Sequence, residues 1–544
     1  MSWPGRPCDH GARPGEPSRR ASRVHAMVVV PKQKPVVLCL LDGFGEREAR
    51  EGNAVRLAKA EAITRLGERF GKTRLGASGE AVGLSAGKCG SGVLGYEAIG
   101  TGRTPRPART RIDEAIAAKK LWANKIIERA MWIACDRSCR LHLFAPISAD
   151  GAHGTLDHLR TMVRVCEAND VKVVVHAFLE EKAAAPRSAW KLLEPLAFEL
   201  EGKGVIGTVM GQSYAMDRSG RWDRVQKAYA AIVRGEAKTK ETPYEALQVA
   251  YQAKLTDGNV EPTRIGEYEG MVGSFMADFA SGQSAGWSWF GEEAGLFLTH
   301  RSDRVEQLAA MMVRRNVPPE VVEYLTDRKK PVYAFDEFGL LSLVELDPEL
   351  EVRSAFPDEP PEGTLGEVIA AAGLTQIRIA EPDRARHVAR GFDGGRRAPR
   401  AGEEIRVVEA ASVAETATRV IEGGSHDVVI VSLAAADHAA HRGDLAAAIE
   451  AVDAVDAAVA QIAAATEAKG GALFVVGTHG GCEEMLDAEG KPRGGHTTNP
   501  VPFVSTSERG RLAEGKGLAD VAKAVLEVLG IEAPSGMTGD RSPQ

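Results

Sequence analysis

The sequence has few cysteines, no long apolar run and little net charge, and each of these absences excludes a class of protein. Only seven of its 544 residues are cysteine, and no two form a Cys-x-x-Cys pair. Scattered thiols favour a reducing compartment over a disulfide framework, so we expect a cytoplasmic protein. No apolar run reaches the roughly 20 residues that span a bilayer, which excludes a membrane-spanning protein. A formal net charge of −7 argues against nucleic-acid binding.

Both ends of the chain are predicted to be tails. Residues 1–34 are rich in Arg, Pro, Gly and Ser, and they contain no apolar segment of the kind found in secretory signals. This composition predicts disorder, and Met27 is a candidate start because structure-like sequence begins there. Residues 536–544 are predicted to form a C-terminal tail.

Short apolar runs alternate with stretches of helical spacing, such as residues 54–70. The runs predict strands at residues 35–41, 141–148, 171–179, 204–211, 426–437, 471–481 and 494–504, the last three with adjoining loops. Alternating strands and helices predict an α/β fold with parallel sheets. Linker-like stretches at 103–110 and 356–364 separate a middle region from the rest. We therefore predict one discontinuous domain (35–106 and 357–535) and an inserted α/β domain (107–345), at roughly 100–200 residues per domain.

Glycine is dense between residues 76 and 103. Glycine lets backbone approach a ligand or another segment closely. The pattern therefore predicts a loop folded tightly around something.

Acidic and histidine side chains follow three of the predicted strands. Asp42, Asp437 and His479 each come at or just after the carboxyl end of an apolar run. Ligands bind at that edge of open α/β sheets, because the loops from neighbouring strands converge there. Asp437 and His441 are four residues apart and can share one helix face, and His496 lies in a glycine-flanked loop. The set is typical of a site for a divalent cation such as Mn²⁺ or Zn²⁺.

The sequence resembles the cofactor-independent phosphoglycerate mutases from about residue 35 to 535. The similar blocks occur in the family's order. They are LLDGFGEREAREGNAVRLAKA, ASGEAVGLSAGKCGSGVLGYEAIGTGR, HAFLEEKAAAPRSAW, YAMDRSGRWDRVQKAY, RSDRVEQ, TLGEVIAAAGLTQIRIAE, THGGCEEM and GGHTTNPVPF. The resemblance implies an alkaline-phosphatase-like domain with an inserted transferase domain. It also implies two Mn²⁺ ions, a phosphoserine intermediate and no requirement for 2,3-bisphosphoglycerate.

The resemblance implies one complete metal site and one degenerate site. Asp437, His441 and His496 match the ligands of the first. For the second site, Asp42 and His479 match, but the sequence has Thr478 where the family has an aspartate. Because hard cations depend on carboxylate charge, we expect one bound ion and much weaker binding of a second.

The family's nucleophilic serine is replaced by Gly92, within the segment Gly90-Ser91-Gly92. Ser91 is the adjacent hydroxyl, and Thr478 offers another. A displacement of about 1 Å can lower a rate on the order of 10²-fold, so neither is an equivalent replacement.

The resemblance also implies a set of substrate-binding residues in and near the inserted domain. An Arg-Asp pair of the family is replaced by Lys182 and Ala183, a further arginine by Gln212, and an active-site lysine by Arg384. The residues assigned to substrate binding are His153, Lys182, Arg218, Arg301, Arg304 and Arg384.

Three functions remain open on the sequence. The first is a mutase that interconverts 3- and 2-phosphoglycerate through a relocated hydroxyl. The second is a catalytically inactive paralogue that binds a phosphorylated acid, and the third is a phosphohydrolase with a single metal ion. Loss of the covalent carrier removes the step that defines the mutase reaction, which favours impaired or lost activity. We expect a monomer.

Overall fold

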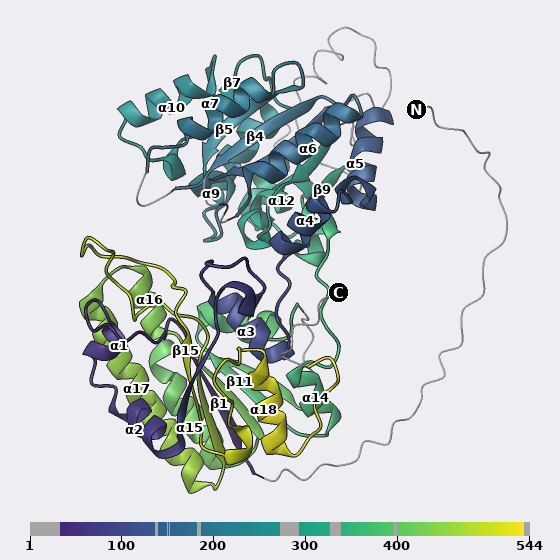
Figure 1. The fold of residues 1–544 in the computed structure, drawn as a ribbon. Coiled ribbons are helices and arrows are strands. Elements are labelled where there is room, and N and C mark those ends of the chain that lie inside the picture. Colours follow the sequence, from purple (N-terminus) through teal and green to yellow (C-terminus); the bar gives the residue numbers. More distant parts are fainter. Residues whose placement is uncertain are drawn as a thin grey trace, which may run out of the picture.

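A computed structural model describes most of the chain and shows two lobes, each built on one β-sheet (Figure 1). The described residues are 33–136, 140–148, 151, 153–181, 186–271, 293–326, 339–395 and 400–537. The predicted tails, 1–34 and 536–544, fall almost wholly outside these ranges. Within the described ranges, no helix is both long and apolar enough to cross a membrane.

The sheet of the first lobe combines strands from both ends of the described chain. Its order is β12-β11-β13-β1-β14-β15-β2, in which β15 and β2 form antiparallel pairs and the other pairs are parallel. The strands are β1 (Val36–Leu41), β2 (Lys72–Leu75), β11 (Gln376–Ala380), β12 (Glu403–Val407), β13 (Val428–Leu433), β14 (Ala472–Gly477) and β15 (Val501–Ser505). The mixed α/β fold expected from the sequence is confirmed.

The second lobe has an eight-stranded sheet of order β10-β9-β8-β3-β4-β5-β7-β6. Only the β5–β7 pair is antiparallel. The strands are β3 (Leu141–Ile147), β4 (Val173–Leu179), β5 (Gly204–Gly211), β6 (Lys238–Lys240), β7 (Thr263–Ile265), β8 (Ala294–Phe297), β9 (Leu340–Val344) and β10 (Arg353–Phe356). This sheet continues past residue 345, because β10 is its edge strand.

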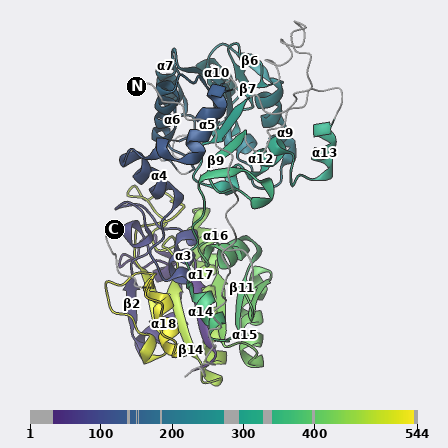
Figure 2. The same ribbon diagram turned by 90° about the vertical axis from the view of Figure 1, so that its right-hand side faces the viewer.

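Helices surround both sheets (Figure 2). Those of the first lobe are α1 (Ala54–Leu57), α2 (Glu61–Phe70), α3 (Gly92–Thr101), α14 (Leu365–Ala371), α15 (Val413–Gly423), α16 (Ala435–His441), α17 (Leu445–Ala468) and α18 (Asp520–Leu529). Those of the second are α4 (Ala108–Ala117), α5 (Lys125–Asp136), α6 (Leu156–Ala168), α7 (Trp190–Glu199), α8 (Gln212–Ala215), α9 (Trp222–Tyr229), α10 (Pro243–Gln252), α12 (Glu306–Val313) and α13 (Pro319–Thr326). The helical pattern of residues 54–70 is interrupted, because Ala60 adopts a positive φ of 34°.

The central strand β1 shows why the first sheet is covered on both faces. All six of its residues are buried. Side chains alternate between the faces of a strand, so Val36, Leu38 and Leu40 join the apolar cluster that contains α3, α14 and α18. Val37 and Leu41 pack on the other face, with α15 and α17. A strand buried on both faces reads as a continuous apolar run, which is why the sequence predicted it.

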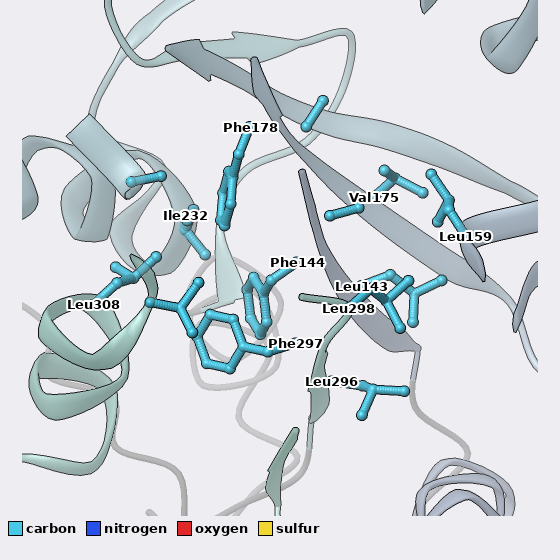
Figure 3. Packing of buried hydrophobic residues seen from close by; sticks show 14 of the residues in the cluster. Leu143, Phe144, Leu159, Val175, Phe178, Ile232, Leu296, Phe297, Leu298 and Leu308 are labelled. Carbon is cyan, nitrogen blue, oxygen red and sulfur yellow. The ribbon is translucent and has the colours of Figure 1, made fainter. Parts of the chain in front are cut away.

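The core of the second lobe is centred on aromatic side chains from neighbouring parallel strands. Phe144, Phe178 and Phe297 lie together in Figure 3, with Ile232 and Leu308 beside them. The Phe144 and Phe297 ring centroids are 4.7 Å apart, within the usual range for paired aromatic rings. This packing holds β3, β4 and β8 as a rigid base for the loops that follow them.

The expectation of a continuous glycine-rich loop between residues 76 and 103 is wrong for its last third. Residues 92–101 form helix α3, at the edge of the first lobe that faces the second (Figure 1). The glycines of this helix allow close packing rather than an irregular path. A Cβ at Gly95 would collide with the Thr478 carbonyl, and one at Gly100 with the Phe392 carbonyl. The glycines therefore seat α3 directly against the end of β14.

Helix α3 also carries a partly buried carboxyl group, which predicts a pH-dependent stability. Burial, and to a lesser degree the neighbouring Asp358, raise the pKa of Glu97 from 4.5 to about 7. The unfolded chain loses this proton near pH 4.5 and the folded chain keeps it to about pH 7, so stability falls as the pH rises between these values. We expect Glu97→Gln to raise the free energy of unfolding at pH 8 by about 1–3 kcal/mol and to change little at pH 4.

Scanning calorimetry at the two pH values measures this difference. Glu68→Gln, an exposed change on α2, is the matched control and should alter neither value. Equal effects of Glu97→Gln at both pH values would contradict the prediction.

Candidate functional site

The carboxyl ends of three adjacent strands form the floor of the candidate site. β1 lies between β13 and β14 in the sheet. Asp42 follows β1, Thr478 and His479 follow β14, and Asp437 lies on the short helix α16 after β13. Asp42, Thr478 and His479 are at most 1% exposed, and Asp437 is 3% exposed. The buried side chains therefore meet at one edge of the sheet, as ligand-binding residues do in open α/β sheets.

Four side chains that can bind a metal ion converge on one side of this edge. His479 Nε2 lies 3.0 Å from Asp437 Oδ1, and His496 Nε2 lies 3.9 Å from the same oxygen. His441 Nε2 lies 3.6 Å from Asp437 Oδ2 and 3.1 Å from His496 Nε2. Ligands held about 2.0–2.2 Å from one cation are themselves roughly 3.0–3.5 Å apart. The spacing of these donors is therefore compatible with a cation between them.

A hydrogen bond fixes the tautomer of His496, and its surroundings keep the ring neutral. Its Nδ1 donates to the carbonyl oxygen of Gly90 at 2.8 Å, which leaves the Nε2 lone pair directed toward His441 and Asp437. Burial and the neighbouring His479 lower the pKa of His496 to about 3, so the ring is neutral near pH 7. A neutral imidazole with a fixed tautomer is the form that binds a metal ion.

Asp437 is held as a carboxylate. Burial alone would raise its pKa, but the contact with His479 and the nearby His441 and His496 lower the pKa well below its usual value. A permanently ionised carboxylate among imidazoles supplies the negative charge that a divalent cation requires.

The other side of the edge is occupied by a guanidinium group. Arg384 follows β11 on a short 3₁₀ turn, and its side chain is 11% exposed. Its Nε donates to Asp42 Oδ2 at 2.6 Å, and its Nη2 donates to Asp437 Oδ2 at 2.6 Å. Nη1 donates to Asp383 at 2.8 Å. Burial alone would lower the pKa of Arg384, but the flanking carboxylates Asp42 and Asp437 raise it, so the group carries a full positive charge.

The remaining oxygen of Asp42 is also engaged. Thr478 Oγ1 donates to Asp42 Oδ1 at 2.6 Å and therefore accepts from His479 Nδ1, which lies 2.9 Å away. The hydroxyl of Tyr96, on α3, lies 3.4 Å from Asp42 Oδ2 and 2.6 Å from Ser432 Oγ. Both carboxylate oxygens of Asp42 therefore accept hydrogen bonds from protein side chains.

Gly92 is the first residue of α3 and faces the same cluster. A Cβ built on Gly92 would lie 3.6 Å from His479 Cε1 and 3.7 Å from His387 Cδ2, which are ordinary contact distances. A side chain at this position would therefore project toward the imidazoles. Ser91 is instead the N-cap of α3, where its Oγ accepts from the Leu94 N–H at 3.5 Å. The Ser91 hydroxyl therefore caps the N-terminus of α3.

The second lobe contributes an arginine cluster. Arg301 forms two hydrogen bonds with Asp303, at 3.1 and 2.9 Å, and Arg218 donates to the same carboxylate at 3.2 Å. Arg304 Nε lies 4.0 Å from it. Burial and the like charges of Arg218 and Arg301 lower the pKa of Arg304 to about 10. Three arginines around one carboxylate leave two positive charges, which suits a phosphate or carboxylate ligand.

This arginine cluster lies close to the first lobe. Arg386 is two residues after Arg384, and its Nη2 contacts Ser302 Oγ at 3.4 Å. It also lies 3.8 Å from Glu306. A pocket at this boundary is lined by Glu306, Asp347, Arg386, Ala389 and Arg390. The cation cluster and the arginine cluster are therefore only a few residues apart across the boundary between the lobes.

The other predicted residues have different positions. His153 is 8% exposed and its Nδ1 lies 3.0 Å from Glu180 Oε2. Lys182 and Ala183 lie outside the described residues, and Gln212 begins α8. Sequence reasoning missed His387, which lies beside Gly92 on a π-helical turn and stacks edge-on against Tyr96. His387 belongs to no apolar run, helical pattern or family motif, so nothing in the sequence indicated that it lies at the site.

Comparison with known proteins places this arrangement in a family. The model of the Metalloenzyme superfamily matches residues 34–533. The chain is 35% identical to the 2,3-bisphosphoglycerate-independent phosphoglycerate mutase of Moorella thermoacetica, over 94% of this chain and 99% of the relative. It is 34% identical to the mutase of the same name from Nitratidesulfovibrio vulgaris, over 93% and 98% of the two chains.

A solved structure has the same overall fold. The Leishmania mexicana phosphoglycerate mutase, crystallised at low cobalt concentration, superposes with a TM-score of 0.77 at 21% identity, and the match covers 94% of this chain and 99% of that one. The chain is thus a member of the Metalloenzyme superfamily. Within that superfamily, it belongs to the family of 2,3-bisphosphoglycerate-independent phosphoglycerate mutases, whose resemblance was visible in the sequence.

Proposed function

We propose that this protein binds phosphoglycerate and one divalent cation between its lobes, but does not carry the phosphoryl group on a serine as the mutase reaction requires. The observation that carries this proposal is the position of Gly92. It lies where a side chain would face the imidazole cluster, and it offers no hydroxyl. The neighbouring Ser91 hydroxyl accepts a long hydrogen bond, at 3.5 Å, from the Leu94 N–H at the N-terminus of α3.

Retention of the arginine cluster supports the choice of ligand. The relatives are named as phosphoglycerate mutases, and their substrate carries a phosphate and a carboxylate. Arg301, Arg304 and Arg218 provide a surplus of two positive charges around Asp303. Guanidinium groups bind such oxyanions through paired hydrogen bonds. We assign His153 and Lys182 to the same binding region, whereas Arg384, which the resemblance also assigned to substrate binding, instead donates to Asp42, Asp383 and Asp437.

The donor set fits one divalent cation. Asp437, His441 and His496 provide one carboxylate and two imidazoles with converging donor atoms, which suits Mn²⁺. When bound, such an ion polarises phosphoryl oxygens. Asp42 has both oxygens engaged by Thr478 and Arg384, so it does not fit the role of ligand to a second ion.

The two sheets support the domain organisation expected from the sequence. We propose that residues 35–106 and 357–535 form the cation-binding domain, and that the segment inserted between them forms the substrate-binding domain. Ligand binding between them would draw on residues of both.

Binding of phosphoglycerate is expected to depend on Arg304. Hydrogen bonds to charged groups contribute about 1.5–3 kcal/mol, so Arg304→Ala should weaken 3-phosphoglycerate binding by about 10- to 100-fold. Isothermal titration calorimetry in the presence of Mn²⁺ measures this change.

Arg221→Ala is the matched control, because Arg221 pairs with Asp223 and its side chain is 54% exposed. This variant should bind as the unmodified protein does. The proposal is wrong if the unmodified protein does not bind 3-phosphoglycerate, or if both variants bind alike. Release of inorganic phosphate during the titration would instead identify a single-metal phosphohydrolase.

A further inference from the structure

We infer that the guanidinium of Arg384 takes the place of a second metal ion, and that His479 thereby becomes a ligand of the single ion at Asp437. This inference deepens the proposed single-cation site and rests on it. It concerns the charges around Asp42 and Asp437 in the first lobe. It does not depend on which anion the arginine cluster of the second lobe binds.

The first step is the position of the positive charge. Arg384 lies between Asp42 and Asp437, at 2.6 Å from an oxygen of each. These carboxylates are buried, and a buried carboxylate is stable only when it is paired. A metal ion in this space would meet the same two carboxylates. The guanidinium therefore already provides the charge that an ion would provide.

The second step is the loss of ligands around Asp42. A hydroxyl, Thr478 Oγ1, donates to Asp42 Oδ1. It also accepts from His479 Nδ1, and as a neutral hydroxyl it supplies none of the negative charge that an aspartate at this position would give a cation. Gly92 adds no oxygen from α3. A hard divalent ion at Asp42 would therefore lack the oxygen ligands that it requires.

The third step is the direction of His479. Because Thr478 Oγ1 gives its proton to Asp42, His479 Nδ1 is the donor in the contact between them. His479 Nε2 then faces Asp437 Oδ1 at 3.0 Å. His479, Asp437 and His496 form a compact group whose donor atoms lie within 4.8 Å of one another. With His441, the group provides three imidazoles and one carboxylate for one ion.

Counting bound Mn²⁺ tests this inference without any assay of activity. The apo protein is titrated with Mn²⁺ by calorimetry, and the bound metal is then determined by elemental analysis. We expect about one ion per chain for the unmodified protein. Arg384→Met combined with Thr478→Asp removes the guanidinium and adds a carboxylate beside Asp42, so its count should rise toward two at saturating Mn²⁺, whereas Thr478→Asp alone should stay at one. His479→Ala should weaken the single site at least about 10-fold.

Two further variants keep the result decisive. Arg386→Met removes a nearby arginine that contacts Ser302, and its count should stay at one. If that double variant does not fold, Arg384→Lys combined with Thr478→Asp keeps a positive charge but cannot bridge two carboxylates with a fork of donors, and it should bind two ions.

Two bound ions of similar affinity in the unmodified protein would overturn the inference. A count of one in both Arg384 variants would also overturn it. Failure of 3-phosphoglycerate to bind, with the metal counts as expected, would affect only the proposed function.

Discussion

The triple variant Gly92→Ser, Thr478→Asp and Arg384→Lys is expected to interconvert 3- and 2-phosphoglycerate at least about 10³-fold faster than the unmodified protein. Removal of a catalytic nucleophile can lower turnover on the order of 10⁶-fold, so restoring a nucleophile recovers a large part of such a loss. The site can accept the serine, because a Cβ at Gly92 would lie no closer than 3.6 Å to His479 or His387.

Each substitution addresses one feature of the site. Gly92→Ser supplies the hydroxyl, and Thr478→Asp supplies a carboxylate beside Asp42. Arg384→Lys removes the guanidinium that pairs with both Asp42 and Asp437. An enolase-coupled assay with added Mn²⁺ measures the rate. Mass spectrometry of the intact protein detects one added phosphoryl group on the variant and none on the unmodified chain.

The matched control carries Ser91→Ala in the unmodified background. Ser91 caps α3, so this change should cost about 1 kcal/mol of stability and leave the already low rate unchanged. Turnover of the unmodified protein in the usual range of about 1–10³ s⁻¹ would falsify the proposed loss of the phosphoserine route. A rate that depends on Ser91 would show that this hydroxyl acts as the nucleophile.

Arg378→Ala is expected to lower the free energy of unfolding of the first lobe by about 3 kcal/mol. Arg378 lies on β11, is fully buried and forms two hydrogen bonds with Asp393 at 2.9 and 3.1 Å. It also donates to the Val388 carbonyl at 2.7 Å. Removing one partner of a buried ion pair leaves an uncompensated charge, which usually costs about 3–5 kcal/mol. Arg400 also contacts Asp393, so we expect the lower end of this range.

Calorimetric unfolding measures this loss, which corresponds to a melting temperature lower by about 6–12 °C. Arg406→Ala is the control: Arg406 pairs with Glu404 on the edge strand β12, and its side chain is 41% exposed. An exposed pair contributes about 0–1 kcal/mol, so the control should barely change the melting temperature. Equal losses for the two variants would show that the buried network contributes no more than a surface pair.

The Arg378 network also affects the candidate site. It fixes the segment from Val388 to Asp393, which follows directly after Arg384 and His387 in the chain. Loosening this segment would remove the support that holds Arg384 between Asp42 and Asp437.

Seven of the fifteen strands in the described residues were predicted, and most of these are buried on both faces. β1, β3, β4, β5, β13 and β14 read as continuous apolar runs, and the structure confirms each within a few residues. The short strand β6, with the sequence Lys-Thr-Lys, has no apolar pattern and was missed. Helix α3 was also missed. Its glycines, which usually indicate a loop, are needed here for contact with the Thr478 and Phe392 backbones.

The sequence by itself determined the positions of the strands that read as apolar runs, the acidic and histidine residues at their ends, and the absence of a hydroxyl at Gly92. These follow from local patterns and from residue identity at single positions. Only the tertiary structure decided that Arg384 pairs with Asp42 and Asp437, because these partners are 342 and 53 residues away and meet only when the strands are adjacent in the sheet. Where a long charged side chain ends depends on the carboxylates that folding brings within its reach, and no local pattern encodes that.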